Sequence, residues 1–242
     1  MTEVSLILPA YNEVDKLEHA VERTAEELME IVPSFEIIIA EDGSTDGTDA
    51  IAAGLARRYA FVKHLHSDKR LGKGDALKKA CKEAKGATIA YFDVDLATDM
   101  KHLEELIHSI EKEGFDFATG SRLLSESEVK RRLKREIASR VFNLLVRILL
   151  RSKLHDHQCG FKSFKRSSLF ILMDEVKDQH WFWDTELLVR AQRRGCKVKE
   201  FPVKWHQGTT TKVDFFNDVV KMGLKIIGLW WVLRWGGKRR RK

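Results

Sequence analysis

The chain has 242 residues, of which 43% are hydrophobic and 33% charged, so disorder, a collagen-like repeat and a disulfide-stapled miniprotein are excluded, and one domain with appended segments or two small domains is expected. The three cysteines, Cys81, Cys159 and Cys196, form no CxxC pair, which favours reduced thiols and oxygen ligands for any metal. The net charge of +7 is uneven, because residues 126–153 carry +6 and residues 211–242 carry +7, which leaves −6 on the remainder.

Short apolar runs alternate with amphipathic stretches through the first half of the chain. The pattern predicts strands and helices in alternation, the strands at 4–9, 35–41, 61–66, 87–92 and 116–120 and the helices at 14–31, 47–59, 74–85 and 100–112. Such βαβ units form a doubly wound α/β fold around a mostly parallel sheet. Ligands of these sheets bind beyond the carboxyl ends of the strands, so the residues that follow each strand are the candidates for chemistry.

The first two expected strands end in polar turns. Tyr11 and Glu13 follow the first strand, and the ring of Tyr11 suits stacking on a base, although a plain loop with Asn12 as a helix N-cap fits equally well. Asp42 follows the second strand and suits hydrogen bonds from a nucleobase or a ribose, whereas residues 44–46 suit a helix cap.

Residues 70–76 combine glycines, Lys73 and the expected start of a helix, which is an arrangement that binds phosphates in some proteins. The spacing differs from GxxxxGK[ST], and no GxGxxG follows a strand, so a P-loop NTPase and a dinucleotide-binding dehydrogenase are not favoured. A position of Lys73 beside a pyrophosphate remains open.

The fourth expected strand ends in two carboxylates, Asp93 and Asp95, that one residue separates. Two like charges at the end of a buried strand require a positive partner. A hard divalent cation such as Mg²⁺ or Mn²⁺ supplies it, because it accepts carboxylate and phosphate oxygens at once. The alternative is an acidic loop with Asp99 as the N-cap of the next helix.

Two basic segments with apolar and aromatic residues are expected to be helical, residues 130–152 and 214–235, and a basic tail follows at 238–242. Helices of this composition lie in a membrane interface, and the alternative is that they pack on the body or on a second subunit. A nucleic-acid partner is not expected, because no recognised binding motif accompanies the charge. No secretory signal is evident and the apolar run 226–232 is too short to span a bilayer, so we expect a cytoplasmic protein.

In order and spacing, the motifs resemble family 2 glycosyltransferases of the GT-A fold: LPAYNE (8–13), EDGSTDGT (41–48), GKGDAL (72–77), DVD (93–95) and GSR (120–122). Three later motifs make the chain most similar to dolichyl-phosphate glucosyltransferases, with dolichyl-phosphate mannose synthases next: HDHQCGFKSF (155–164), FWDTELL (182–188) and FPVKW (201–205). The resemblance covers about residues 4–212. It implies a catalytic domain over 1–212 and a membrane-associating segment over 213–242.

The resemblance implies a metal-dependent, inverting hexosyltransferase. Mg²⁺ or Mn²⁺ is expected on Asp93 and Asp95, and the nucleotide sugar is expected on Pro9, Tyr11, Glu13, Asp42, Lys73, Asp93, Val94 and Asp95. Catalytic roles are expected for Asp95, Asp156, Asp184 and Arg122, with Arg122 on a phosphate and with helix or loop capping as the alternative for Asp156 and Asp184. An anionic acceptor needs cations, for which Lys162, Arg131, Arg135 and Lys212 are the candidates. His155, His157 and His206 are expected to be hydrogen-bonded loop residues, and Cys159 a packed one.

One position departs from the resemblance. Mannose synthases carry DADLQ, in which the glutamine completes the metal site, whereas this chain has Ala97 there, so water or Asp99 would fill the gap. The departure favours glucose, from UDP-glucose, over mannose, from GDP-mannose. The expected reaction moves the hexose to dolichyl or another polyprenyl phosphate at the inner face of the cell membrane, where the protein is peripheral. A soluble glycan acceptor is the alternative, and the oligomeric state is left open.

Overall fold

A mixed, mostly parallel sheet forms the centre of the computed structural model, which describes residues 2–206 and 215–235, with the backbone alone for 215–220. Its seven strands lie in the order β3 (Val62–Leu65), β2 (Phe35–Glu41), β1 (Val4–Ala10), β4 (Thr88–Phe92), β7 (Phe161–Lys165), β5 (Phe117–Ser121) and β8 (Val198–Pro202). Strand β7 runs antiparallel to both of its neighbours, and the other pairs are parallel. Strands β6 (Glu128–Lys130) and β9 (Lys204–His206) form a separate parallel pair.

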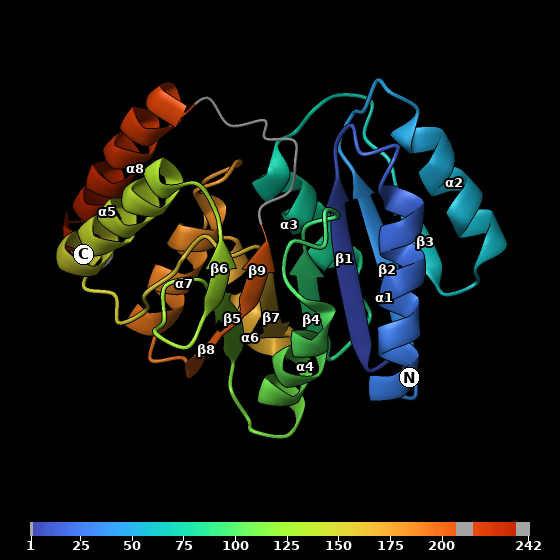
Figure 1. Cartoon of the computed structure of the whole chain (residues 1–242). Helices are drawn as coiled ribbons and strands as arrows, with labels where there is room; N and C mark the ends of the chain where they lie inside the picture. Colours follow the sequence, from blue (N-terminus) through green and yellow to red (C-terminus); the bar gives the residue numbers. More distant parts are fainter. Residues whose placement is uncertain (1, 207–214, 236–242) are drawn as a thin grey trace, which may run out of the picture.

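Helices cover both faces of the sheet (Figure 1). Side chains alternate along β1, so Leu6 and Leu8 pack on one face and Ile7 packs on the other. The first face is covered by α1 (Leu17–Ile31), α2 (Thr48–Arg58) and α4 (Leu103–Glu111), which follows the short 3₁₀ helix η1 (Met100–His102). The second is covered by α3 (Lys73–Glu83), α6 (Arg166–Met173) and α7 (Trp183–Arg193). This three-layer arrangement confirms the predicted α/β fold.

The sequence pattern missed the strands of the second half. The five predicted strands are present, but β7 enters the sheet between β4 and β5, where a plain succession of βαβ units would place β5 beside β4. The pattern of β7, FKSFK, carries a lysine at its centre, and Lys162 is nevertheless fully buried. A buried lysine is rare, so a periodicity argument places such a segment on the surface.

The two basic segments form α5 (Leu133–Leu150) and α8 (Phe215–Trp235), which lie side by side at the far end of the molecule from α2 (Figure 1). Val146 and Leu150 pack there with Ile226 and Leu229, and Phe182 joins them from the body. Part of each helix therefore packs internally. The other faces expose apolar side chains: Leu133, Ile137, Val141, Leu144, Leu145 and Ile148 on α5, and Leu224, Ile227, Trp231, Val232 and Trp235 on α8.

Within the residues that the structure describes, no helix is both long enough and apolar enough to span a bilayer. Lys212 and the basic tail 238–242, both named from the sequence, lie outside the described residues.

Candidate active site

The predicted site residues lie at one edge of the sheet. Strand β1 is parallel to β2 and β4, and β7 is antiparallel to both β4 and β5, so the carboxyl ends of β1, β2, β4 and β5 face the same side. Asp42 follows β2, Asp93 follows β4 and Arg122 follows β5. Side chains that are far apart in the sequence thus meet at this edge.

An ion pair connects the GKG motif to the end of β4. The Lys73 ammonium donates to Asp93 Oδ1 at 2.5 Å and lies 5.5 Å from the ring centre of Tyr91 and 5.0 Å from that of Trp181. Burial alone would lower the pKa of Lys73, but the charges of Asp93 and Asp184 outweigh it and raise that pKa. Lys73 is therefore a fixed positive charge beside the carboxylate pair.

The glycines of the GKG motif have a packing role. A Cβ on Gly74 would lie 2.8 Å from the Cβ of Trp183, and the amide of Gly74 donates to the carbonyl of Gln179 at 2.8 Å. Gly72 has a φ of +100°, and a Cβ there would lie 2.2 Å from Nδ1 of His180. The first amides of α3 are thus used by the segment before α7, and Lys73 supplies the charge of this motif.

Gly160 permits the position of Asp93. A Cβ on Gly160 would lie 2.2 Å from Asp93 Oδ2, and the amide of Asp93 donates to the carbonyl of Gly160 at 3.3 Å. No other residue type has room beside this carboxylate. The sequence analysis did not single out Gly160, although it stands inside the quoted HDHQCGFKSF motif.

The donor set at the end of β4 fits a hard divalent cation. Asp95 is exposed at the sheet edge, and partial desolvation together with the charge of Asp93 raises the pKa of its carboxyl group. Asp95 Oδ1 accepts from the amide of Ala97 at 3.1 Å. Two carboxylates that disfavour each other's ionisation are stabilised by a shared cation, and carboxylate oxygens are ligands that Mg²⁺ and Mn²⁺ prefer.

Two neighbouring residues differ from the expectations. The side chain of Val94 is 3% exposed and packs in the hydrophobic core, so the predicted nucleotide contact is wrong for this side chain. Val94 lies between Asp93 and Asp95, and its side chain faces the opposite way from theirs, into the core. The carboxylate of Asp99 accepts from the amide of Lys101 at 3.1 Å and caps η1, which is the alternative given for it.

At the end of β5, Arg122 forms a bidentate pair with Asp156. Arg122 Nε donates to Asp156 Oδ2 at 2.7 Å and Nη2 donates to Oδ1 at 3.0 Å, while the Arg122 amide donates to Oδ2 at 3.1 Å. Although burial opposes ionisation of Asp156, the Arg122 guanidinium holds the pKa of this carboxyl well below its usual range. Asp156 is fully buried, so its observed role is to position Arg122.

Arg131 lies near this pair without a partner of its own. Its Nε and Nη2 atoms are buried and make no hydrogen bond within the described residues. Burial and the charge of Arg122 lower the pKa of Arg131. Buried donors without a hydrogen bond are unfavourable, and a guanidinium is well suited to pair with an anion.

The other two predicted acceptor cations stand differently. Lys162 is fully buried and its ammonium donates to the carbonyl of Cys159, so the expectation that it meets an acceptor phosphate is corrected to a structural role beneath the site. Its place in the central strand β7 explains this burial. Arg135 lies in the first turn of α5 and its amide donates to the carbonyl of Arg132 at 3.0 Å.

The ends of β1 and β2 form the third part of the site. The buried carboxylate of Asp42 accepts from the amides of Leu71 at 2.6 Å and Gly72 at 3.0 Å. The guanidinium of Arg70, which the sequence analysis had not singled out as a site residue, lies 3.9 Å from the ring centre of Tyr11. Glu13 Oε2 accepts from the Lys16 ammonium at 2.8 Å, and Pro9 lies within β1 opposite Ala40. Asp42 therefore holds the loop that brings Arg70 to Tyr11.

Asp184 lies in the first turn of α7, whose N-cap is Phe182, so the capping alternative for Asp184 is not realised. Its carboxylate accepts from the Tyr91 hydroxyl, and burial with the Asp184 charge raises the pKa of Tyr91 well above its ordinary value.

His157 is a hydrogen-bonded loop residue and Cys159 is a packed one, as expected from the sequence. His157 contacts Ser152 and Asn143 at 2.7 Å each, and burial raises the pKa of Cys159 to about 11.

The mixed, mostly parallel sheet flanked by helices, with carboxylates after its central strand β4, is a GT-A-like arrangement. The profile of the family described as glycosyl transferase family 2 matches residues 5–170, so the chain belongs to this family.

Three known proteins illustrate the similarity. Glycosyltransferase AglD of Haloferax volcanii is 51% identical over 96% of this chain, which spans 37% of the length of AglD. A dolichyl-phosphate beta-glucosyltransferase of Trichomonas vaginalis is 34% identical over 93% of this chain and 72% of its own length. The crystal structure of glucosyl-3-phosphoglycerate synthase from Mycobacterium tuberculosis with Mn²⁺, UDP and glucosyl-3-phosphoglycerate has the same fold, with a TM-score of 0.66 at 19% identity over 95% of this chain and 79% of that chain.

Proposed function

We propose that this chain transfers a hexose, glucose in the first place, from a uridine diphosphate sugar to dolichyl or another polyprenyl phosphate at a membrane surface. The observation that carries the proposal is the partly buried side chain of Arg131, whose buried Nε and Nη2 donors make no hydrogen bond within the described residues, near the charge of Arg122. An acceptor phosphate supplies the oxygens that these donors lack. The name of the dolichyl-phosphate beta-glucosyltransferase relative agrees with this class of acceptor.

The acceptor is its own nucleophile in this reaction. The second pKa of a phosphate monoester is about 6, so a phosphate oxygen is anionic near neutral pH and needs no strong base. This oxygen attacks the anomeric carbon, the bond from that carbon to the diphosphate oxygen breaks, and the nucleoside diphosphate leaves with the electron pair. Asp156 is bound to Arg122 and Asp184 to Tyr91, so neither is needed as a proton acceptor.

The leaving diphosphate is the second anion of the reaction. Asp93 and Asp95 would hold Mg²⁺ or Mn²⁺, which neutralises negative charge on a diphosphate. Lys73 holds Asp93 in place by its ion pair, and the Arg122 guanidinium is oriented by Asp156 toward the same edge. Asp42, Tyr11 and Arg70 are the proposed contacts of the nucleoside, with Glu13 and Pro9 beside them.

The exposed apolar faces of α5 and α8 support docking on the membrane that holds the acceptor. Trp231 and Trp235 stack on each other at the exposed face of α8, and basic residues of both helices lie near. Aromatic and aliphatic side chains with lysines and arginines favour the lipid interface. The protein is accordingly proposed to be peripheral on the inner face of the cell membrane.

Transfer of labelled sugar into dolichyl phosphate in liposomes tests the reaction, with UDP-glucose, GDP-mannose or UDP-N-acetylglucosamine as donor and with Mg²⁺, Mn²⁺ or a chelator. We expect labelled lipid from UDP-glucose and none in the chelator. Label from GDP-mannose would reassign the sugar. Binding of the nucleotide sugar without any lipid product would overturn the lipid acceptor in favour of a soluble glycan.

Arg131→Ala tests the acceptor site in the same assay. Loss of a charge-assisted contact worth about 1.5–3 kcal/mol should raise KM for dolichyl phosphate about ten- to 100-fold with little change in KM for the donor. Arg23→Ala is the matched control, because Arg23 is exposed on α1 and pairs with Glu26 of the same helix. An equal effect of both substitutions would remove Arg131 from the acceptor site.

A further inference from the structure

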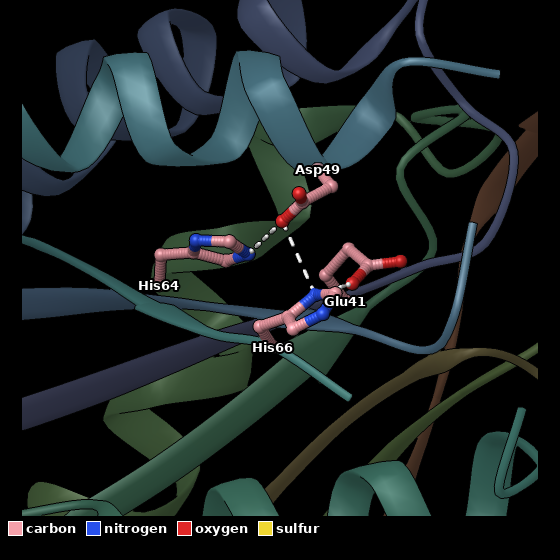
Figure 2. Close-up of side chains that lie close together, drawn as sticks. All are labelled: Glu41, Asp49, His64 and His66. Carbon is pink, nitrogen blue, oxygen red and sulfur yellow. Dashed lines mark hydrogen bonds and ion pairs between the residues drawn. The ribbon is translucent and has the colours of Figure 1, made fainter. Parts of the chain in front are cut away.

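A second group of metal-ligating side chains lies at the β2–β3 side of the sheet (Figure 2). Glu41 is the last residue of β2, Asp49 is in the first turn of α2, His64 lies in β3 and His66 follows β3. One ligand atom of each of these side chains lies within 4.8 Å of those of the other three. Strand β1 separates β2 from β4, so this group is distinct from Asp93 and Asp95.

The spacing of the group suits a four-coordinate ion. Asp49 Oδ1 lies 3.4 Å from His64 Nε2 and 3.1 Å from His66 Nδ1, and the side chains point toward a common centre in Figure 2. Tetrahedral Zn²⁺ has bonds of about 2.0–2.2 Å to nitrogen and oxygen, which place its ligand atoms about 3.3–3.5 Å apart. His66 Nδ1 and Glu41 Oε2 lie 2.6 Å apart and would separate slightly when an ion replaces the proton between them.

An unused ring nitrogen points into this group. His64 Nε2 is buried and makes no hydrogen bond within the described part of the chain, and the His64 side chain is 12% exposed. Its nearest carboxylate oxygen, Asp49 Oδ1, lies 3.4 Å away, which is an ion-pair contact, and a buried nitrogen without a hydrogen bond is unfavourable unless a ligand meets it.

Further contacts orient the other ligands. The Glu41 side chain is fully buried, and its second oxygen accepts from the amide of Ser44. His66 Nε2 lies 3.3 Å from Asp68 Oδ1, so one ring nitrogen faces a carboxylate while the other faces the group. The Asp68 side chain is 97% exposed, so this contact is a surface ion pair beside the group.

We propose that Glu41, Asp49, His64 and His66 bind one divalent transition-metal ion, with Zn²⁺ as the ion that fits two imidazoles and two carboxylates. The ion joins β3 to α2 and holds Glu41, whose neighbour Asp42 anchors the loop at Leu71 and Gly72. Its role is structural. The ion stabilises the segment from residue 41 to residue 49, on which the proposed nucleoside contacts depend. Binding of the ion does not depend on which sugar or acceptor the chain uses.

Titration of the untagged full chain with Zn²⁺ alone, followed by calorimetry, tests the proposal. The background carries Asp93→Asn and Asp95→Asn, so that the expected donor-site cation cannot contribute. We expect one Zn²⁺ per chain and an at least tenfold loss of affinity in both His64→Gln and His66→Gln. The control is His19→Gln, at an exposed position of α1, which should bind within twofold of the background.

A variant at a partly exposed ligand guards against misfolding. Asp49 is 48% exposed, so Asp49→Asn should keep the metal-free melting temperature and still lose at least tenfold in Zn²⁺ affinity. X-ray absorption should show imidazole and oxygen neighbours of zinc. Unchanged affinity in the His64, His66 and Asp49 variants, or sulfur neighbours that indicate binding to cysteine, would overturn the proposal. Neither outcome bears on sugar transfer.

Discussion

Gly160 determines where a carboxylate of the active site lies, although it has no side chain. The Asp93 carboxylate occupies the place of a Cβ at position 160. The Gly160→Ala change should therefore move Asp93 and weaken its ion pair with Lys73, with a loss of transfer rate of at least 100-fold. Kinetics with saturating donor check this, and Gly114→Ala, where a Cβ meets no atom within 4 Å but φ is +72°, serves as a control for backbone strain. Full activity of the Gly160 variant would contradict the close approach.

Asp95→Asn should abolish metal-dependent transfer and leave the free energy of unfolding within about 0.5 kcal/mol of the parent, because the carboxylate is exposed and acts on a ligand. Transfer assays over a Mn²⁺ series and urea unfolding measure the two effects. Asp99→Asn is the matched control, since Asp99 caps η1. Parent-like activity of the Asp95 variant across the Mn²⁺ series would remove this residue from the metal site.

The sequence predicted those site residues whose position follows from the end of a strand, such as Asp42, Asp93 and Arg122. It did not predict the burial of Lys162 within the sheet or of the Val94 side chain in the turn after β4. Arg70 and Gly160 were missed because their proximity to Tyr11 and Asp93 depends on contacts between distant segments. Strand ends are local features, whereas these contacts are set by tertiary packing.

At the scale of elements, α5 presents two different faces. Val146 and Leu150 face α8 and the body, whereas Leu144 and Ile148 are 52% and 64% exposed. The periodicity of the sequence predicted the helix but gave both faces similar apolar character. Tertiary structure distinguishes the packed face from the free one.

The double change Leu144→Glu and Ile148→Glu should reduce binding to anionic liposomes at least fivefold, because two apolar side chains at the lipid interface are replaced by like-charged carboxylates. Stability should change little, since both side chains are exposed. Sedimentation with liposomes measures the binding, and Met29→Glu, at an exposed apolar position of α1, is the control. Equal liposome binding of the double variant and the Met29→Glu control would assign the free face of α5 to another partner.

At the scale of the whole molecule, the sequence predicted the layers and the mostly parallel sheet but not the path of the chain in its second half. Strands β1, β2, β3 and β4 follow one another through helices of clear periodicity, as βαβ units do. Strands β7 and β8 include charged residues, and β7 reverses the direction of the sheet. Their pairing partners are distant in the sequence, so local patterns do not reveal them.

His157 connects parts of the molecule that are distant in the chain and should make stability depend on pH. Asn143 of α5 contacts His157 Nδ1, and Ser152 contacts His157 Nε2. Ser152 also contacts Gln192 of α7. Burial lowers the pKa of His157 to about 3. In the unfolded chain the His157 imidazole takes up a proton below a pH of about 6.5, whereas in the folded chain it does so only below about pH 3. The free energy of unfolding therefore falls by about 1.4 kcal/mol per pH unit, through this group, as the pH falls below 6.

Urea unfolding between pH 6 and pH 4.5, above the range in which most carboxyl groups titrate, measures this slope. The slope of the free energy of unfolding against pH should be smaller in His157→Gln than in the parent, by the amount that corresponds to about one bound proton, whatever the absolute stability of the variant. His19→Gln should keep the slope of the parent. An unchanged slope in the His157 variant would show that the folded state admits the proton.

The position of β7 also determines when the molecule is completed during synthesis. Residues 161–165 must enter between β4 and β5, although they follow the end of β4 by about 70 residues. At about 5–20 residues per second, the ribosome releases them roughly 4–15 s later. Until then β4 and β5 are unpaired on their facing sides, and the Asp93 carboxylate lacks its contact with Gly160. The nascent chain therefore completes this edge of the sheet only after residues 161–165 have been released, when strands β1 to β4 have already had time to fold.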